Sequence, residues 1–503
     1  MVKGFKVMKY IAYFLAILAV FVILRLPLFW TPVMDVDEAI YALFSRIWFG
    51  GGVPYVDCVE TKPLGIYFIY GAIFEVFGYY NMLAIHIFTV IWMFVTSIFI
   101  YRITRMLSSD ARAGLLAALF YAVFTTTYTP KIVAALIEPF MLLAVVLQVY
   151  FWMKYEEKPV GACALLSGFF FSCAIVMKYT AGIYFIMMLI YICLSPRKRF
   201  RGFLYFIAGA VPIPLAMVSY LYAKGSLPAF LFWTVSGSLD YVAGGSASID
   251  VTKQLVTRVL PFLAGTAALW IFLAARVRGL TRKMADKREW LVWLWLVLSV
   301  APVAAGKRFY GHYFLMLVPP LCILSAMEIR RWWKNSAVRY LVISFVILAG
   351  VGCLIPRFMM TSLYARLGED DPKSYAKVAS YVRAHTLPGD KILVWGFAPM
   401  IYLQSDRLPA TRFFWSDLAA GRVPAARQDN GLALQNMPIT RLAWKLFFED
   451  MEKNRPLYFI DTSPAGFHGY RHFPIGDYPA LSKYIDDSFT KEAVVDGAVI
   501  YKR

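Results

Sequence analysis

Residues 10–30 read YIAYFLAILAVFVILRLPLFW, and Arg25 is their one charged side chain. This run has the length of roughly 20 apolar residues that a helix needs to cross a bilayer. Ten further apolar runs follow, near residues 81–101, 113–127, 132–152, 160–177, 179–194, 203–222, 256–273, 290–304, 313–327 and 340–356. The pattern predicts a polytopic α-helical membrane protein with about 11 transmembrane helices.

The composition excludes an ordinary soluble protein. Of the 503 residues, 60% are hydrophobic and 16% are charged, and the mean hydropathy is +0.60. Ordinary globular proteins have about 45–50% apolar and about 25% charged residues. The net charge of +20, from 51 Lys and Arg against 31 Asp and Glu, could indicate nucleic-acid binding, so the position of these charges decides its meaning.

The basic residues gather in alternate loops. If the N-terminus is cytoplasmic, the inner segments hold 22 Lys and Arg against 6 acids. This bias is the positive-inside signal of a membrane protein, so nucleic acid is not expected as a partner. We expect an integral protein of a bacterial or archaeal cell membrane, with a cytoplasmic N-terminus and an extracytoplasmic C-terminus. No small-x-small cleavage site follows the first run, which therefore reads as an anchor.

Three regions lie outside the predicted spans. The first outer loop, residues 31–80, contains an acidic stretch, a Gly50-Gly51-Gly52 break and an apolar segment at 63–78, which we interpret as an interfacial helix because a crossing there would reverse the charge bias. A second outer loop covers residues 223–258. Residues 361–503 are expected to form a small extracytoplasmic α/β domain, with an Asp496-Gly497 hairpin near its end.

Ionisable residues gather at the outer ends of several predicted spans. They are Asp35, Asp37, Glu38, Glu60 and Lys62 in the first outer loop, Glu138 in the fourth span, Lys178 after the fifth, and Lys307, Arg308 and His312 before the tenth. Charges at membrane depth are costly and mark functional cavities. The alternative is that Asp35, Asp37 and Glu38 only cap the helix that begins near Ala39.

Several of these residues form a familiar series. Asp37-Glu38, Tyr41, Pro54-Tyr55, Lys62-Pro63 and Phe77-Gly78 resemble the first outer loop of the GT-C glycosyltransferases, in particular the protein O-mannosyltransferase and aminoarabinose transferase superfamily. Glu138-Pro139, Lys178 and Gly311-His312-Tyr313 resemble its later signatures. The resemblance covers residues 10–360, so residues 1–360 would form the catalytic membrane module.

The resemblance implies an inverting glycosyltransferase. It would move a sugar from a polyprenyl-phosphate carrier to a lipid, glycan or protein acceptor on the extracytoplasmic side. By analogy Asp37 is the base, Glu38 orients or assists it, and Lys62 stabilises the departing phosphate, with Lys178 and Arg308 as further candidates. Asp35, Tyr41, Tyr55, Glu60, Glu138, His312 and Tyr313 are candidates for the cavity around them.

Alternatives accompany these assignments. Asp35-x-Asp37 resembles a metal-binding DxD motif, although we expect neither a metal nor another cofactor. Lys178 could extend from a helix end to the interface, and His312 and Tyr313 could be interface anchors. The aminoarabinose enzymes have Arg where this chain has Ile40 and Glu where it has Thr61, which places that substrate in doubt. A polytopic lipid or solute transporter, or flippase, would also carry charges in its bundle.

Overall fold

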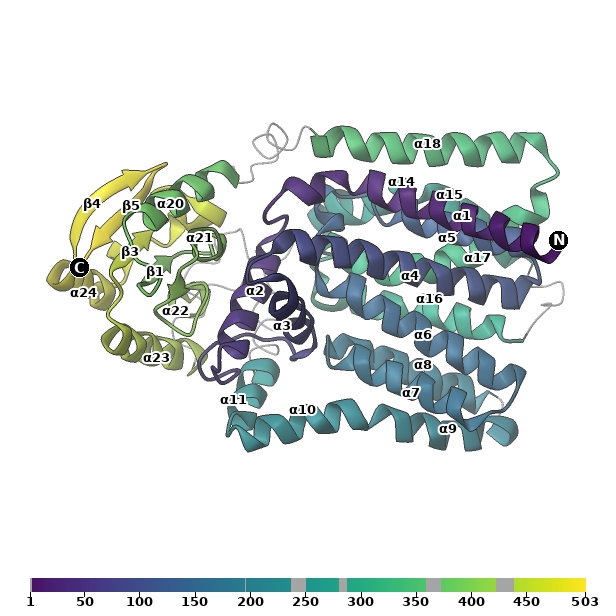
Figure 1. Ribbon diagram of the computed structural model, residues 1–503, viewed down its shortest axis with the longest axis horizontal. Helices are drawn as coiled ribbons and strands as arrows, with labels where there is room; N and C mark the ends of the chain where they lie inside the picture. The colour runs from purple at the N-terminus through teal and green to yellow at the C-terminus, as the bar shows by residue number, and fades with distance from the viewer. Residues whose placement is uncertain (1, 195, 237–249, 280–286, 359–371, 422–437) are drawn as a thin grey trace.

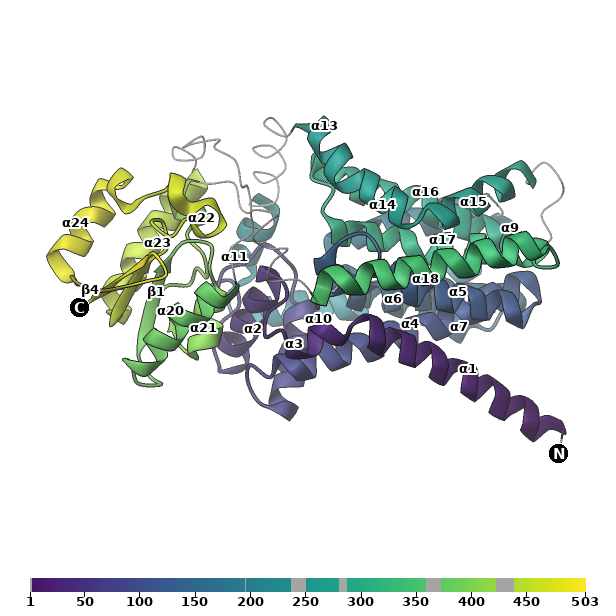
Figure 2. The same ribbon diagram turned by 90° about the horizontal axis from the view of Figure 1, so that it is seen from above.

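The computed structural model describes residues 2–194, 196–236, 250–279, 287–358, 372–421 and 438–503. Long helices run side by side in a bundle, and strands and shorter helices form a second part that ends at the C-terminus (Figure 1). The short helices α2 and α3 lie between the two parts, at one end of the bundle, in both views (Figures 1 and 2). The predicted boundary at residue 361, and residues 237–249 of the second outer loop, lie outside the described residues.

The membrane module is almost wholly helical. Its helices are α1 (Val2–Leu24), α2 (Val36–Phe49), α3 (Gly65–Phe77), α4 (Met82–Ser108), α5 (Ala111–Phe124), α6 (Ile137–Glu157), α7 (Gly161–Ile175), α8 (Ile183–Cys193), α9 (Pro196–Ala210), α10 (Pro212–Ala223), α11 (Leu227–Leu231), α13 (Val251–Gln254), α14 (Leu260–Gly265), α15 (Ala267–Gly279), α16 (Glu289–Ala304), α17 (Val318–Trp332) and α18 (Ser336–Phe358). Short 3-10 turns connect them, among them η1 (Leu26–Trp30), η2 (Pro130–Val133), η3 (Tyr179–Gly182), η6 (Ala305–Lys307) and η7 (Gly311–Leu317).

Within the described residues, five helices are long and apolar enough to cross a membrane, and a sixth span results if the pair at 251–265 and 267–278, bent by 73°, counts as one. Six shorter apolar helices accompany them. Each of the eleven apolar runs predicted from the sequence falls on one of these helices or on the bent pair. The one apolar helix among them that matches no predicted run is α3. The helical membrane fold is therefore confirmed, whereas length and apolarity alone do not fix the number of crossings at eleven.

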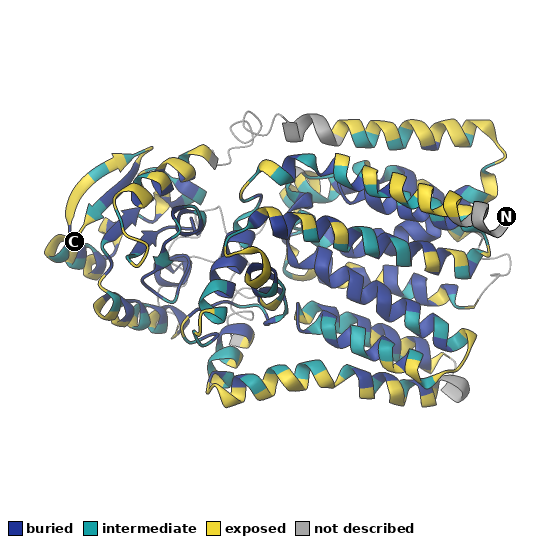
Figure 3. Cartoon of the chain, in the orientation of Figure 1, coloured by how far each residue is buried: buried dark blue, intermediate teal, exposed yellow. Residues whose placement is uncertain are grey.

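Burial separates the inner from the outer helices. The residues of α6 are mostly buried, whereas α10 and the described part of α18 expose large apolar side chains (Figure 3). Such exposed apolar faces suit contact with lipid. In contrast, α3 is seen almost end-on in Figure 1, across the direction of the bundle helices, as expected for an interfacial helix.

The C-terminal part contains a five-stranded sheet in the order β2-β1-β3-β5-β4. Its strands are β1 (Lys391–Trp395), β2 (Leu408–Pro409), β3 (Tyr458–Asp461), β4 (Thr490–Val495) and β5 (Ala498–Lys502), and its helices are α20 (Pro372–Ala384), α21 (Met400–Ser405), α22 (Asp417–Ala420), α23 (Pro438–Asn454) and α24 (Pro479–Ser488). β1 is parallel to β2 and β3, while β5 is antiparallel to β3 and β4. Asp496 and Gly497 both have positive φ, as a tight hairpin turn requires.

Contacts through α2 and the first outer loop join the two parts. Arg46 of α2 forms an ion pair with Asp406 at 2.6 Å, and the Val59 backbone N–H donates to the Arg412 carbonyl at 2.9 Å. α2 is consequently buried from Glu38 to Ser45. The C-terminal part and α3 cover α2 from two sides.

Candidate active site

Asp37 enters the site from the first turn of α2. Asp35 is the N-cap of this helix, and its side chain accepts a hydrogen bond from the Asp37 backbone N–H at 3.1 Å. The capping role that the sequence offered as an alternative for three acids is thus filled by Asp35. The Asp37 carboxylate points elsewhere: Oδ2 accepts from the Tyr41 hydroxyl at 3.2 Å, and 24% of the side chain is exposed.

Lys62 lies beside Asp37, in the segment between α2 and α3. Its Nζ is 3.7 Å from Asp37 Oδ1 and 3.1 Å from Glu60 Oε2, and it lies over the Tyr41 ring at 5.2 Å. Glu60 is almost fully buried and also accepts from the Tyr67 hydroxyl at 2.6 Å. Glu60 therefore holds Lys62 from within, while 22% of the lysine side chain remains exposed.

The segment around Lys62 is fixed by its backbone. The Tyr55 hydroxyl donates to the Lys62 carbonyl at 2.7 Å, and the Gly65 N–H donates to the Val176 carbonyl at 2.8 Å. A Cβ at position 65 would lie 2.7 Å from that carbonyl oxygen, so only glycine permits this approach. Tyr55 itself is buried and supports the loop without facing the site. The hydrogen bond between Gly65 and Val176 brings the segment that carries Lys62 close to the end of α7, just before Lys178.

Lys178 and Glu138 form the second charged pair of the site. Lys178 Nζ lies 2.5 Å from Glu138 Oε1, and Glu138 is buried in the first turn of α6. The same ammonium lies over the Tyr313 ring, 4.1 Å from its centroid. A cation that merely reached the interface would have neither partner, so this geometry argues against that alternative for Lys178.

The segment before η7 closes another side. Gly311 packs so closely against Thr129 that a Cβ would meet Thr129 Cγ2 at 2.6 Å. His312 stacks on Tyr310 at 5.8 Å between ring centroids, and the Arg308 guanidinium donates to the Tyr310 hydroxyl at 3.2 Å. Lys178 lies near enough for its charge to act on Asp37, and the His312 ring lies against Tyr313 with 4.7 Å between the ring centroids. His312 and Tyr313 therefore belong to the site, whereas Arg308 is held by its own segment.

The electrostatics of the site favour charged side chains. Burial raises the pKa of the Asp37 carboxyl, but the Lys62 ammonium and the other neighbouring cations outweigh it, so that pKa lies below its ordinary value. For Lys62, burial lowers the pKa, but the carboxylates of Asp37 and Glu60 raise it well above the usual range. The site therefore holds an ionised carboxylate beside fixed ammonium groups.

Asp35 differs from Asp37. Burial, opposed mainly by the charge of Lys131, raises the pKa of Asp35 to about 6. The pKa values of Asp35 and Asp37, the two acids of the DxD stretch, are thus shifted in opposite directions. Within the described residues no group of three or more His, Cys, Asp and Glu side chains is arranged to hold a metal ion.

Glu38 faces away from Lys62. It is fully buried, its Oε2 accepts from the Met34 N–H at 2.7 Å, and its Oε1 accepts from the Ala135 N–H at 2.6 Å. Oε1 also lies 3.4 Å from His86 Nε2. Glu38 thus ties the start of α2 to the segment before α6, which makes it a positioning residue for Asp37.

The sequence reading missed Lys131 and Arg258. Lys131 directly precedes the fourth predicted span, and Arg258 closes the second outer loop, where its guanidinium donates to the Arg308 carbonyl at 2.8 Å. Arg258 also lies over the Tyr310 ring at 4.6 Å. Both are basic residues at the outer end of a span, so the boundary criterion that identified Lys178 would have found them.

Comparisons with known proteins bear on the fold of the chain. The family model of dolichyl-phosphate-mannose-protein mannosyltransferases matches residues 61–222. The structure of ArnT from Cupriavidus metallidurans bound to undecaprenyl phosphate superposes with a TM-score of 0.64 at 13% identity, covering 98% of each chain. The chain has the GT-C glycosyltransferase fold. The resemblance stated from the sequence is confirmed.

A second GT-C structure extends the comparison. The archaeal oligosaccharyltransferase AglB from Archaeoglobus fulgidus, in complex with an inhibitory peptide and a dolichol-phosphate, has a TM-score of 0.56 at 13% identity. The match covers 95% of this chain and 72% of AglB. No curated protein sequence matches the chain. At these identities the solved structures establish the GT-C fold, and the activity has to be argued from the site.

Proposed function

We propose that the protein is an inverting glycosyltransferase that moves a sugar from a polyprenyl-phosphate carrier to an acceptor hydroxyl. The observation that carries this proposal is the juxtaposition of an exposed, ionised Asp37 carboxylate with the Lys62 ammonium at 3.7 Å. The carboxylate can accept the proton that the acceptor hydroxyl loses. The ammonium can stabilise the negative charge that develops on the carrier phosphate. The acceptor is a lipid, glycan or protein on the extracytoplasmic side.

Asp37 is the general base of the proposed reaction. The acceptor oxygen forms a bond to the anomeric carbon, and its proton passes to the Asp37 carboxylate as that bond forms. Tyr41 donates to Asp37 Oδ2, which leaves Oδ1 as the oxygen that faces the cation and the substrate. The second residue of the pair, Glu38, orients Asp37 through the backbone contacts described above.

Lys62 and Lys178 stabilise the leaving group. When the bond between the anomeric carbon and the phosphate oxygen breaks, negative charge grows on the carrier phosphate, and fixed ammonium groups stabilise it. Each lysine is held by a buried glutamate, Glu60 or Glu138. These cations supply the positive charge for which nucleotide-sugar enzymes use a metal, so we propose that no metal takes part. Arg308 is a weaker candidate for binding the phosphate, because its guanidinium donates to the Tyr310 hydroxyl of its own segment.

The names of the similar proteins support the carrier class. The matching family model describes dolichyl-phosphate-mannose enzymes, and the two solved relatives were captured with undecaprenyl phosphate and with a dolichol-phosphate. A polyprenyl phosphate is the ligand that these names share. These names share no acceptor, so the acceptor of this chain has to come from experiment.

The test uses purified full-length protein in phosphatidylcholine nanodiscs with a polyprenyl-phosphate mannose donor. Addition of an extract of envelope lipids and glycans should release free polyprenyl phosphate and move labelled sugar into the extract in equal amounts. The proposal would be contradicted if polyprenyl phosphate were released at the same rate with and without the extract. It would also be contradicted if none of a series of polyprenyl-phosphate sugars released it. Orientation is tested separately, since a reporter fused after Arg503 should be active outside the cell and silent inside.

A further inference from the structure

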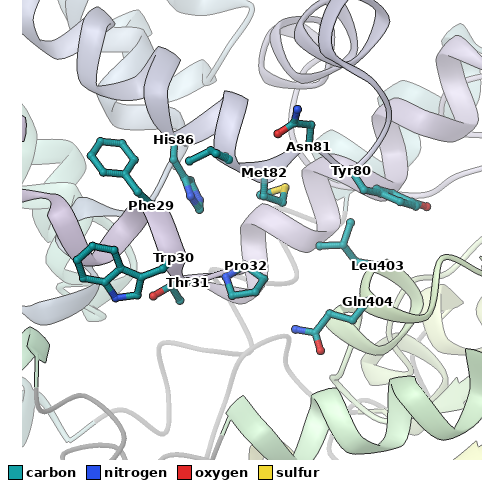
Figure 4. Close-up of a pocket in the computed structure, with 11 residues that line it drawn as sticks. Phe29, Trp30, Thr31, Pro32, Tyr80, Asn81, Met82, His86, Leu403 and Gln404 are labelled. Atoms are coloured by element: carbon teal, nitrogen blue, oxygen red, sulfur yellow. The ribbon is translucent and has the colours of Figure 1, made fainter.

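A cavity lies near the start of α2, apart from Asp37 and Lys62. It has a volume of about 460 Å³ and sits between the end of η1, the start of α4 and α21 of the C-terminal part (Figure 4). This volume falls in the range of about 300–1,000 Å³ that small-molecule sites occupy. Its lining residues are Phe29, Trp30, Thr31, Pro32, Tyr80, Asn81, Met82, Leu83, His86, Leu403 and Gln404. None of them belongs to the proposed donor site.

The lining contains no acidic, lysine or arginine side chain. A phosphate would find no cation here, which separates this cavity from the place of Lys62 and Lys178. Aromatic and aliphatic groups form much of the wall, and Phe29 and His86 point into the space in Figure 4. A neutral ligand with both apolar faces and hydrogen-bonding groups fits such a wall.

One lining residue, Gln404, carries a buried polar atom, its Oε1, that makes no hydrogen bond within the described part of the chain. Buried polar atoms usually have partners, so this one calls for an explanation. Figure 4 shows the Gln404 amide at the edge of the cavity, facing it from the C-terminal part. A hydroxyl-rich ligand in the cavity would offer a donor to Gln404 Oε1.

The cavity opens where lipid is expected. Trp30 is 59% exposed and Leu83 is 48% exposed, and they lie at the outer ends of the first and second apolar runs. Tryptophan is typical of the membrane–water boundary, where one side of the ring is apolar and the other is wet. A ligand that enters past these residues can keep an apolar chain in the bilayer.

We infer that this cavity binds the uncharged saccharide head group of a membrane lipid, which serves as the acceptor. Saccharide rings offer apolar faces to Trp30 and Phe29 and hydroxyls to Gln404. His86 lies between the cavity and the start of α2, because its Nε2 is 3.4 Å from Glu38 Oε1 and Glu38 directly follows Asp37. The acceptor role rests on the proposed function, whereas binding can be measured without turnover.

The experiment places the protein in phosphatidylcholine nanodiscs that contain monoglucosyl diacylglycerol, and native mass spectrometry counts the bound lipid. We expect the glycolipid to be retained in preference to diacylglycerol and to phosphatidylglycerol. Gln404→Leu and Trp30→Ala should each lower retention about three- to tenfold, the effect of one lost polar contact or aromatic face. Trp290→Ala, which removes a 49% exposed tryptophan from another apolar run, should leave retention unchanged.

Equal retention of diacylglycerol, or wild-type retention by folded Gln404→Leu and Trp30→Ala proteins, would overturn the inference. So would soluble methyl glucoside that binds as tightly as the glycolipid, because the site would then not need a lipid. Glycolipid binding without any release of polyprenyl phosphate would contradict the acceptor role and the proposed function together. Release of polyprenyl phosphate without glycolipid binding would contradict this inference alone.

Discussion

Two clusters of buried charge lie at different places in the chain, and they are built differently. The first joins Asp37, Lys62 and Glu60 near the C-terminal part. The second joins Arg276 of α15 to Glu289 of α16 and Glu328 of α17, at helix ends that the charge bias assigns to the cytoplasmic side. Arg276 holds Glu289 with two short contacts of 2.8 and 2.7 Å and reaches Glu328 at 3.4 Å.

Side chains around the second cluster donate further hydrogen bonds to its two glutamates. The indole N–H groups of Trp293 and Trp332 donate to Glu289 and Glu328 at 3.0 and 2.9 Å. Arg276 is 11% exposed, half the value of Lys62 at 22%. Short contacts from several donors suit a cluster that stabilises the fold, whereas the long 3.7 Å pair of the partly exposed Asp37 and Lys62 can be exchanged for contacts with a substrate.

Asp37→Asn should have the largest effect on transfer. The amide keeps the shape of the side chain but accepts no proton, so transfer should fall by about 10²–10⁴-fold, as is typical of general base loss. The rate is measured as released polyprenyl phosphate, and donor binding should persist. Because the pKa of Asp37 lies below its ordinary value, the wild-type rate should show no loss from this group between pH 8 and pH 5.

The control for Asp37→Asn is the melting temperature in detergent. Asp35 caps the helix, so the substitution should leave folding nearly unchanged. Near-normal transfer by a folded variant would remove Asp37 from the mechanism.

Arg276→Met should reverse this pattern and damage stability instead of chemistry. It removes the cation that two buried glutamates share, and although Glu328 keeps Arg331 at 3.2 Å, Glu289 loses a buried ion pair, which costs about 3–5 kcal/mol. Denaturant unfolding in detergent should show this loss. Donor affinity of the remaining folded protein should equal that of the wild type, and a selective loss of donor binding would contradict the contrast between the clusters.

Much of the fold could be predicted from local sequence. The apolar runs predicted the bundle helices because a helix that crosses the bilayer needs about 20 apolar residues. The Asp496-Gly497 pair likewise predicted the hairpin turn. The sequence could not reveal that α2 is covered on both sides. That burial depends on Arg46, Phe44 and Val59 meeting residues more than 350 positions away, and local periodicity carries no such information.

The site was predictable in its residue types more than in their roles. Position at the outer boundary, together with the family resemblance, identified Asp37, Lys62, Lys178 and Glu138. The separation of Asp37 from Glu38 could not be foreseen, because consecutive helical residues point about 100° apart and only the packing shows which direction faces solvent. The position of His86 beside Glu38 could not be predicted either, because that contact forms between α4 and α2, two separate helices.

Lys62→Ala tests the open cluster by removing its cation. Donor affinity should fall about 10- to 100-fold, in line with the loss of a charged hydrogen bond, and Lys62→Arg should recover part of it because the charge remains while its geometry changes. The affinity is measured with an uncleavable polyprenyl-phosphate analogue. Lys154→Ala, at an exposed ion pair with Glu157, is the matched control and should bind the analogue normally.

Asp35→Asn should have the smallest effect and should act on stability. Asparagine is as good an N-cap as aspartate, so the helix start is kept and transfer should change little. Burial raises the folded-state pKa of Asp35 to about 6, above its ordinary value, so folding favours the protonated form and stability is lost as the pH rises from about 4 through 6. At pH 7.5 the neutral amide should therefore melt higher than the wild type, by about 1–4 °C, and the difference should shrink toward pH 4. A lower melting temperature for Asp35→Asn at pH 7.5 would show that the attraction between Asp35 and Lys131 outweighs the cost of burying the charge.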